Sequence, residues 1–373
     1  MIKENLLLYI LNLINYIIIM SNKNELFEKI FKFKNLIDKL SQNGILKDKI
    51  NLPNICVIGD IGCGKSLILE SFLNLNILPI GDEERATLCP FEINLNHIDS
   101  EESFAIFENI KYEDFSKLKE KINEKLSFIK EFKKIGQSPI ILDIYSKKYP
   151  RLKLIDLPGF SHIPEGVAPK MVEEYPIFIA RKYIENPFTI ILCVIPANKF
   201  QDYYALNGLR IAKKMSLSSD YPNNFRKLGV LTKIDIMDLG TDARNMLLNK
   251  EMPIELGYIG IRNKSKIDLY NKISNDEAFK KEKDFFNSHE IYKDIPKDIL
   301  GIDALIKKIS KIFFKLIKDN LPNIPREEKE IRELLDLIDE YSLREDEIYD
   351  IKKIKDENEK IEKKKKKYGN LFG

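Results

Sequence analysis

The sequence predicts an α/β fold with a mainly parallel central sheet that carries helices on both faces. Short runs of β-branched and other apolar residues recur along the chain, and stretches with helical apolar spacing separate most of them. This alternation is typical of a parallel sheet, because two parallel strands need a crossover connection, which is usually a helix. The chain has 373 residues, 44% of them hydrophobic, so a large core and roughly two domains are expected.

The individual elements follow from these patterns in chain order. Seven short apolar runs predict strands at residues 55–58, 91–95, 140–145, 152–155, 189–194, 228–231 and 258–261. Helical spacing predicts helices at residues 25–40, 115–132, 170–184, 206–215, 277–286 and 302–317. The last of these is expected to end near Pro322, because proline cannot continue a helix without the loss of a hydrogen bond. A charged helix is predicted to start again at Arg326.

The most informative segment is residues 59–66, which match the phosphate-binding pattern G-x-x-x-x-G-K-[ST]. It follows a predicted strand and precedes an apolar stretch, residues 67–73, that reads as the start of a helix. Backbone N–H groups and the positive end of the helix dipole then point at phosphate oxygens. We expect Lys65 to reach the β- and γ-phosphates and Ser66 to place its hydroxyl on Mg²⁺. The segment therefore predicts a P-loop NTPase with three α/β/α layers.

Three further residues complete the expected metal and phosphate site. Asp156 follows the predicted strand 152–155, where a carboxylate can hold Mg²⁺, usually through water. Gly159 can give its N–H to the γ-phosphate, and Thr87, in a polar loop, is the best candidate for the threonine that contacts Mg²⁺. The expected metal ligands are Ser66, Thr87 and Asp156. The expected catalytic residues are Lys65, Ser66, Thr87 and Gly159.

A second polar segment, Thr232, Lys233 and Asp235, follows the predicted strand 228–231 and predicts the nucleotide base. The Asp235 carboxylate can accept two N–H bonds from a guanine edge, while the stem of Lys233 can lie on the ring. Adenine offers no such pair of donors, and a site built around polar groups rejects a partner that leaves them unpaired. The segment therefore predicts GTP in preference to ATP.

Composition excludes several other classes of protein. The net charge of +3 shows no strong basic field, which argues against nucleic acid as the main partner. The four cysteines lie far apart with no C-x-x-C pair, so we expect reduced, mostly buried thiols in a cytoplasmic protein. The three histidines are too scattered to suggest a zinc site.

The two ends of the chain leave alternatives open. Residues 6–20 are almost wholly apolar, but fifteen helical residues span roughly 22 Å, short of the ~30 Å hydrocarbon core. We favour a non-native extension with Met20 as the working start; a membrane-surface or targeting segment and a packed hydrophobic helix remain as alternatives. Lysines 363–367 lie in a tail that we interpret as solvated, with a polybasic membrane patch as the alternative.

Taken together, the order and the residues of these segments resemble those of the dynamin superfamily of large GTPases, including its Mx-type members. The resemblance runs from about residue 25 to about residue 332. It is carried by residues 52–53, 78–79, 87–90, 154–159, 196–198, 231–244 and 257–265. The last segment looks like the fifth nucleotide motif of the family, which would place Asn263 by the base. The nucleotide-binding residues so implied are Gly59, Asp60, Ile61, Gly62, Cys63, Gly64, Lys65, Ser66, Leu67, Thr232, Lys233, Asp235, Arg262, Asn263 and Lys264.

The resemblance implies a dynamin-type G domain with a flanking helical bundle-signalling element. Residues 1–20 would be an apolar extension, 21–45 the first bundle-signalling helix, 46–300 the GTPase domain, 301–350 further bundle-signalling helices with the start of a truncated stalk, and 351–373 a charged tail. It also implies binding of GTP and GDP, a Mg²⁺ and a monovalent cation, GTP-dependent G-domain homodimers, and membrane fission or organelle division at a membrane surface. Microtubule binding is a further family-level expectation. About 50 residues follow Pro322, too few for a full stalk, so we interpret the chain as a fragment, a trimmed chain or a reduced member.

The sequence departs from the family pattern inside the phosphate loop. Ile61 and Gly62 stand where the family usually has glutamine and serine, which position the attacking water and help to hold a monovalent cation. Isoleucine can do neither, and comparable groups are worth about 10³–10⁵ in rate. The first switch, with the acidic run 82–84, and the loop 199–204 are also longer than usual. The alternative hypothesis is therefore a slow or inactive GTPase that serves as a GTP-dependent binding or scaffold module.

Overall fold

A computed structural model describes residues 54–320, apart from residues 79, 81–86, 88, 97, 99, 132–137, 150–151, 161–168, 187 and 200–225, together with residue 347. Several predictions lie outside the described residues. They are the apolar extension, the first bundle-signalling helix, the helix at 206–215, the acidic run 82–84, the loop at 200–204, the helix after Pro322 and the lysine-rich tail.

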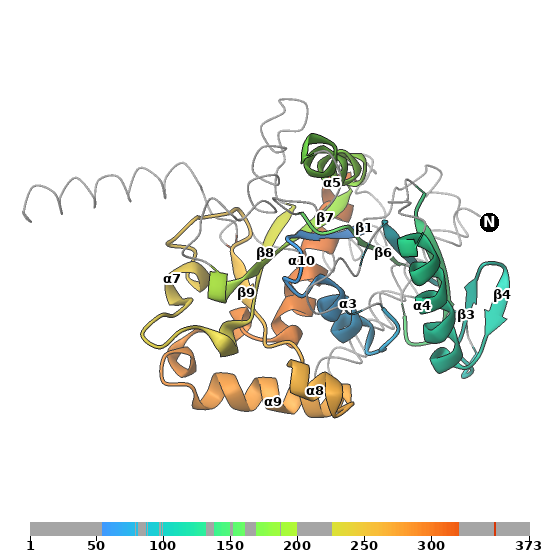
Figure 1. The fold of residues 1–373 in the computed structure, drawn as a ribbon. Helices are drawn as coiled ribbons and strands as arrows, with labels where there is room; N and C mark the ends of the chain where they lie inside the picture. Colours follow the sequence, from blue (N-terminus) through green and yellow to red (C-terminus); the bar gives the residue numbers. More distant parts are fainter. Residues whose placement is uncertain are drawn as a thin grey trace, which may run out of the picture.

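A nine-stranded mixed sheet forms the centre of the described part of the chain, in the order β4-β3-β5-β2-β6-β1-β7-β8-β9 (Figure 1). The strands are β1 (Asn54–Gly59), β2 (Phe91–Asn96), β3 (Phe104–Phe107), β4 (Ile110–Tyr112), β5 (Ile140–Tyr145), β6 (Leu152–Asp156), β7 (Thr189–Pro196), β8 (Lys227–Thr232) and β9 (Tyr258–Gly260). Strands β6, β1, β7, β8 and β9 run parallel to one another, and β2 is parallel to β5. The prediction of a mainly parallel α/β sheet is confirmed.

The sheet reverses direction between β6 and β2, which are antiparallel. This reversal sets Phe91, the first residue of β2, opposite Asp156, the last residue of β6. The chain that enters β2 therefore lies at the same edge of the sheet as the carboxyl ends of β6 and β1.

All seven predicted strands form, but the hairpin of β3 and β4 was not predicted. Its turn is made by Glu108 and Asn109, whose φ angles are 50° and 64°. Two successive positive φ values are typical of the tight turns that join antiparallel strands, and Asn-Gly or Asp-Gly is the usual sequence there. Because glutamate is not a residue that signals such a turn, the pattern gave no indication of the hairpin.

The described helices lie on both sides of the sheet. They are α3 (Lys65–Leu73), α4 (Phe115–Glu131), α5 (Pro169–Ile184), α7 (Arg244–Leu247), α8 (Lys266–Tyr270), α9 (Asn275–Ser288) and α10 (Ile302–Asn320), with short 3₁₀ turns at η1 (Ala197–Lys199), η3 (Ile234–Ile236), η4 (Tyr292–Asp294) and η5 (Lys297–Ile299). The predicted helices at 115–132, 170–184, 277–286 and 302–317 correspond to α4, α5, α9 and α10. The short helices α7 and α8 were not predicted.

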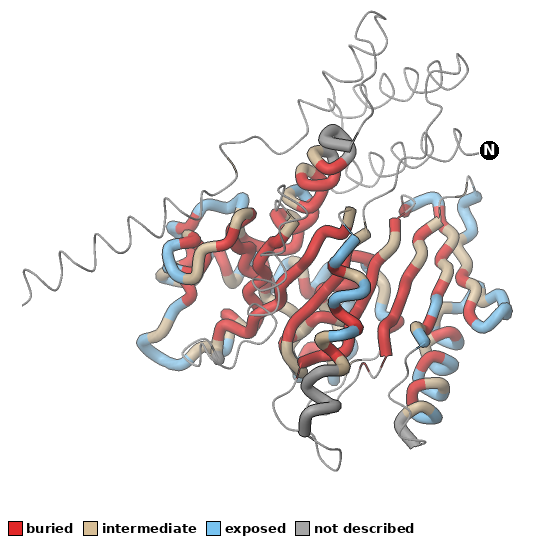
Figure 2. The backbone as a smooth tube through the Cα atoms, turned by 90° about the horizontal axis from the view of Figure 1, so that it is seen from above, coloured by how far each residue is buried: buried red, intermediate tan, exposed pale blue. Residues whose placement is uncertain are grey.

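Alternate residues of the central strands bury their side chains in two separate cores. Ile55 and Val57 of β1 belong to the core beneath α3, α4 and α10, whereas Cys56 and Ile58 belong to the core beneath α5. Strands β7 and β8 are buried along their whole length (Figure 2). Apolar runs without polar alternation are expected when helices cover both faces of a parallel sheet. The three-layer arrangement follows from this.

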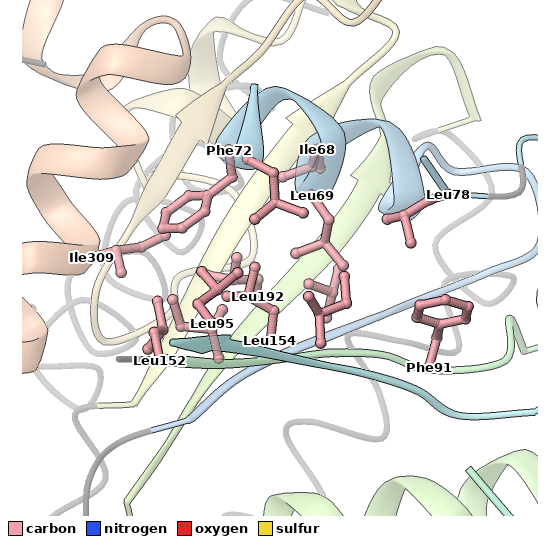
Figure 3. Close-up of a cluster of buried hydrophobic side chains, with 14 of the residues drawn as sticks. Ile68, Leu69, Phe72, Leu78, Phe91, Leu95, Leu152, Leu154, Leu192 and Ile309 are labelled. Carbon is pink, nitrogen blue, oxygen red and sulfur yellow. The ribbon is translucent and has the colours of Figure 1, made fainter. Parts of the chain in front are cut away.

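The first core fixes the helix that follows the phosphate loop. In Figure 3, Ile68 of α3 points toward Leu154 and Leu192 of the sheet, and Phe72 lies beside Ile309 of α10. All five side chains are buried. Burial of one such aliphatic or aromatic side chain contributes about 1.5–3 kcal/mol, so the position of α3 relative to β1 is strongly determined. Among the described helices, none has the length and apolar character that crossing a bilayer requires.

Candidate nucleotide-binding site

The loop between β1 and α3 depends on glycines at two places where the chain passes very close to other atoms. A Cβ atom on Gly59 would lie 2.5 Å from the carbonyl oxygen of Val194 in the neighbouring strand β7. Gly64, with φ of 95°, precedes the first residue of α3, and a Cβ there would lie 2.6 Å from Nδ2 of Asn263. Only glycine fits both places, and the loop therefore wraps tightly around the N-terminus of α3.

Lys65 lies over this loop and is almost completely buried. Its Nζ donates hydrogen bonds to the carbonyl oxygens of Gly59 at 3.2 Å and Asp60 at 3.0 Å. The ammonium group is thus held against the carbonyl oxygens at the start of the loop, and Lys65 itself is the first residue of α3. A cation and unpaired helix N–H groups together favour an anion such as phosphate.

Three oxygen-bearing side chains from separate segments meet beside Lys65. Ser66 Oγ donates a hydrogen bond to Asp156 Oδ2 at 2.7 Å, and Thr87 Oγ1 donates to the same oxygen at 3.1 Å. Asp156 is fully buried, and burial raises its pKa, although the Lys65 charge and the two hydroxyl hydrogen bonds oppose the rise. Its other oxygen, Oδ1, is buried and has no hydrogen-bond partner among the described residues.

This arrangement fits a magnesium ion. Mg²⁺ prefers oxygen ligands and is usually held by one or two carboxylates together with phosphate oxygens and water. The unpaired Oδ1 of Asp156 is costly to bury, and a nearby divalent cation would offset that cost. The described residues contain no group of three or more His, Cys, Asp or Glu side chains that could hold a metal without other ligands. A single carboxylate with two hydroxyls agrees with a metal that shares its coordination with a phosphate.

The last residue of β8, Thr232, forms a hydrogen bond with the backbone of the phosphate loop. Thr232 Oγ1 donates a hydrogen bond of 2.6 Å to the carbonyl oxygen of Cys63. The next residue, Lys233, has a left-handed backbone with φ of 58°, and the chain turns there into η3. The turn directs Asp235 into the same cavity that the phosphate loop borders.

A cavity of about 420 Å³ runs from the phosphate loop to this turn. The predicted residues on its wall are 61–67, Thr87, Gly159, Lys233, Asp235, Asn263 and Lys264. The remaining predicted residues, Gly59, Asp60, Asp156, Thr232 and Arg262, are not among its lining residues. The structure thus brings all the predicted segments to one place, with some of their residues in a layer behind the wall.

Sequence reasoning missed part of the cavity wall. Ile80, Ile236, Ser265, Lys266, Ile267 and Leu269 also line it. Ser265 and Asp268 form a reciprocal capping box at the start of α8, with Asp268 N donating to Ser265 Oγ at 3.1 Å and Ser265 N to Asp268 Oδ2 at 2.9 Å. The pattern S-x-x-D at 265–268 is a signature of a helix start and could have located this wall. Ile236 and Ile267 are largely exposed, as expected for side chains that border an opening for a flat ring.

The loop after β9 connects the two ends of the cavity. Asn263 Nδ2 donates a long hydrogen bond of 3.4 Å to the carbonyl oxygen of Gly64, so this loop touches the phosphate loop directly. At the other end, Arg262 Nε lies 3.5 Å from Asp235 Oδ2. Burial raises the pKa of Asp235, and the charge of Arg262 opposes that rise. The loop after β9 therefore contacts both the phosphate loop, through Asn263, and the turn that carries Asp235, through Arg262.

Comparison with known proteins agrees with this geometry. The family model described as "Dynamin family" matches residues 55–234, and the model described as "Dynamin central region" matches residues 242–370. The chain belongs to the dynamin family. It is 32% identical over 336 residues to dynamin-related protein dnm1 of Schizosaccharomyces pombe, an alignment that covers 79% of this chain and 42% of that protein.

Two other dynamin-family proteins show a similar identity, and again only part of their length is covered. Dynamin-A of Dictyostelium discoideum is 34% identical over 300 residues, with 77% of this chain and 34% of that protein covered. Dynamin-3 of Mus musculus is 33% identical over 303 residues, with 80% and 33% covered. The chain thus spans between about a third and two fifths of the length of these relatives.

Within this dynamin-family chain, the unusual phosphate-loop residue Ile61 lies against the loop that follows β6. Its N–H donates to the carbonyl oxygen of Phe160 at 3.1 Å. A Cβ on Gly159 would lie 2.8 Å from the Cα of Ile61 and 2.9 Å from its Cγ1. An apolar side chain thus packs beside the glycine that was predicted to donate to a γ-phosphate.

Proposed function

We propose that this chain is a GTPase domain that binds GTP with Mg²⁺ and hydrolyses it to GDP and phosphate. The observation that carries the proposal is the meeting of Ser66, Thr87 and the half-satisfied Asp156 beside the Lys65 ammonium. Membership of the dynamin family supports the same assignment.

Each predicted residue has a role in this proposal. Lys65 and the first N–H groups of α3 hold the β- and γ-phosphates. Ser66 and Thr87 would hold the cation through their hydroxyl oxygens, and Asp156 would hold it through water. Gly159 would offer its N–H to the γ-phosphate. A bound Mg²⁺ would supply positive charge against the negative charge that develops during phosphoryl transfer.

The base end of the cavity supports guanine. Asp235 lies on the wall with its carboxylate beside Arg262, and the stem of Lys233 and the exposed Ile236 and Ile267 border the same space. A carboxylate accepts the two N–H donors on the guanine edge, whereas adenine would leave it unpaired. Rejection of a base that leaves a polar group unpaired is worth orders of magnitude in affinity.

For the whole protein, we propose a role in membrane fission or organelle division, through GTP-dependent pairing of G domains in the cytoplasm or at a membrane surface. This role is supported by family membership alone, because the relatives are two to three times as long as the matched part of this chain. Gly62 carries no side chain that could hold a monovalent cation, so that ion is not included. No observation supports microtubule binding, which is also left out.

The packing of Ile61 against Gly159 favours a second candidate function. A glutamine at position 61 could orient an attacking water, but isoleucine offers neither a donor nor an acceptor. The second candidate is a GTP-dependent binding or scaffold module that holds the nucleotide with little turnover. Single-turnover measurements separate the two, since a scaffold retains unhydrolysed GTP for hours.

The test compares the dissociation constants of GTP and ATP, with and without Mg²⁺, for the wild-type chain, Ser66→Ala and a matched control, Ser116→Ala. Ser116 is an exposed residue of α4 away from the cavity. We expect wild type and control to bind GTP roughly 100-fold more tightly than ATP. Mg²⁺ should tighten GTP binding in both but not in Ser66→Ala. Equal affinity for ATP and GTP, or Mg²⁺ dependence unchanged in Ser66→Ala, would contradict the proposal.

A further inference from the structure

Arg262 occupies a position that its sequence motif did not predict. It was predicted as a nucleotide-binding residue, but it is not among the residues that line the cavity, and its side chain is only 15% exposed. Its guanidinium lies between two carboxylates, with Nε 3.5 Å from Asp235 Oδ2 and Nη2 3.4 Å from Asp268 Oδ2. Of these three side chains, Asp235 alone lies on the wall.

We propose that Arg262 is a positioning residue that holds the Asp235 carboxylate in the orientation that reads guanine. The inference rests on the proposed function, since it names what gives the same site its base specificity. Arg262 itself does not touch the base; it acts through Asp235.

The side of Arg262 that faces away from the cavity is firmly held. Asp268 is almost completely buried and accepts hydrogen bonds from Lys281 Nζ at 2.6 Å and Ser265 N at 2.9 Å. Burial pushes the pKa of Asp268 upward, but the hydrogen bonds from Lys281 and Ser265 and the charge of Arg262 hold it well below its usual range. Asp268 therefore stays anionic and keeps the guanidinium in place.

The backbone of Arg262 is held as well. Its N–H donates to Oε1 of the buried Glu282 at 3.0 Å, and Oε2 of Glu282 accepts from Ile302 N at 3.0 Å. The Glu282 carboxyl group of α9 thus connects the backbone at the start of α10 to the backbone of Arg262. With its backbone and the Nη2 side of its guanidinium held, Arg262 can orient a neighbouring group, although its Nη1 is buried without a hydrogen-bond partner among the described residues.

The charges around Asp235 explain why the Arg262 guanidinium affects the protonation of this carboxylate. Asp235 faces Arg262 and, farther off, the anionic Asp268, whose charge raises the pKa of Asp235. Lys233 adjoins Asp235 on its own loop, and Lys264, Lys266 and Lys65 are the other charged groups on the cavity wall. Without Arg262, burial and Asp268 would both favour a protonated Asp235. A protonated carboxyl accepts fewer hydrogen bonds and would serve guanine less well.

The test measures the dissociation constants of GTP and ITP, with Mg²⁺, at pH 8 and pH 6. ITP carries hypoxanthine, which lacks the 2-amino group of guanine and offers Asp235 one N–H donor in place of two. The chains compared are wild type, Arg262→Gln, Arg262→Lys and a matched control, Arg181→Gln, which removes an exposed arginine of α5.

We expect wild type and Arg181→Gln to bind GTP roughly tenfold more tightly than ITP, with little change between the two pH values. Arg262→Gln should bring the ratio close to one, with a larger loss at pH 6. Arg262→Lys keeps the charge but cannot span both carboxylates, so its ratio should fall by a similar factor at both pH values.

A role in folding alone predicts a different result, namely equal weakening for both nucleotides. A wild-type ratio in Arg262→Gln at both pH values would overturn the inference; should that variant not fold, a wild-type ratio in Arg262→Lys would do so. A wild-type chain that prefers GTP neither to ITP nor to ATP would overturn the proposed function and the inference with it.

Discussion

The two ends of the nucleotide cavity differ in the partners of their buried carboxylates. At the phosphate end, the buried Asp156 has an oxygen with no hydrogen-bond partner among the described residues. At the base end, Asp235 faces a guanidinium, and Asp268 behind it accepts from Lys281, Ser265 and Arg262. The Asp156 carboxylate is therefore only partly paired, whereas the Asp235 carboxylate already faces a cation, although Nη1 of Arg262 is also buried without a hydrogen-bond partner among the described residues. The difference predicts that cation and phosphate determine affinity, and that the base determines selectivity.

The largest effect is expected from Lys65→Ala at the phosphate end. Loss of a charge-assisted contact to two phosphates should weaken GTP binding about 10²–10⁴-fold, since each such hydrogen bond is worth about 1.5–3 kcal/mol. Titration calorimetry measures this, with Lys280→Ala, an exposed lysine of α9, as the control. The loss should be similar for GTP and ITP, and a change in their ratio would contradict the division of labour between the two ends.

The double variant Ile61→Gln, Gly62→Ser tests why hydrolysis should be slow. Restoring a polar side chain beside Gly159 should raise GTP turnover about 100-fold, a part of the 10³–10⁵ that comparable groups supply. Phosphate release under single-turnover conditions, with and without potassium, is the measurement. GTP affinity should change little. A double variant with wild-type turnover would show that Ile61 and Gly62 do not limit the reaction.

Two buried glutamates extend the comparison to pH, one behind the base end and one on the helix that follows the phosphate loop. Burial raises the pKa of Glu282, and that of Glu70 on α3, to about 7 in each case. A carboxyl whose pKa is higher in the folded than in the unfolded state stabilises the fold fully below pH 4.5. That contribution is lost as the pH rises through about 7.

The stability of the wild-type chain should therefore fall between pH 5 and pH 8, by up to about 3 kcal/mol for each glutamate. Glu282→Gln and Glu70→Gln should each remove a comparable part of the fall, as measured by urea unfolding across this pH range, and the other buried carboxyls with raised pKa values, such as Asp156 and Asp235, contribute the rest. If Glu282→Gln alone removes nearly all of it, the raised pKa of Glu70 is contradicted.

The smallest effect concerns two glycines. Gly59→Ala would place a Cβ 2.5 Å from a backbone oxygen of β7, and such overpacking costs about 1–3 kcal/mol. Gly240 also has a positive φ, of 84°, but a Cβ there would meet nothing within 4 Å, so Gly240→Ala should cost only about 1 kcal/mol. Thermal unfolding of both variants measures the difference. Equal costs would mean that backbone conformation alone, and no close approach to β7, requires glycine at position 59.

Most of the fold was predictable because its signals are local. The central strands are apolar over several residues, and the phosphate loop has a fixed spacing of residue types, so both can be recognised from the sequence. Thr87 could be chosen because it lies in a polar loop and the chain has few other threonines. Its place beside Asp156 depends on the antiparallel pairing of β2 with β6, which no pattern in the sequence reveals.

What could not be predicted depends on side-chain direction. Arg262 was predicted to bind the nucleotide, yet it does not line the cavity, because its side chain pairs with Asp268 and its backbone N–H donates to Glu282. A loop has no periodicity from which an inward or outward direction can be derived. Ile267 and Leu269 were missed for the same reason, since α8 is too short to show a helical apolar pattern.

The reversal between β6 and β2 has one further consequence. It divides the sheet into a block of β6, β1, β7, β8 and β9 and a block of β2, β5, β3 and β4, joined along a single strand pair. Ser66 and Asp156 belong to the first block, and Thr87 leads into the second. Thr87 already donates a hydrogen bond to Asp156 across this boundary, and a cation held by Ser66 and Thr87, with Asp156 acting through water, would strengthen that link between the blocks. Nucleotide binding would then couple the unfolding of the two blocks, and the amide hydrogens of β2 would exchange with solvent more slowly.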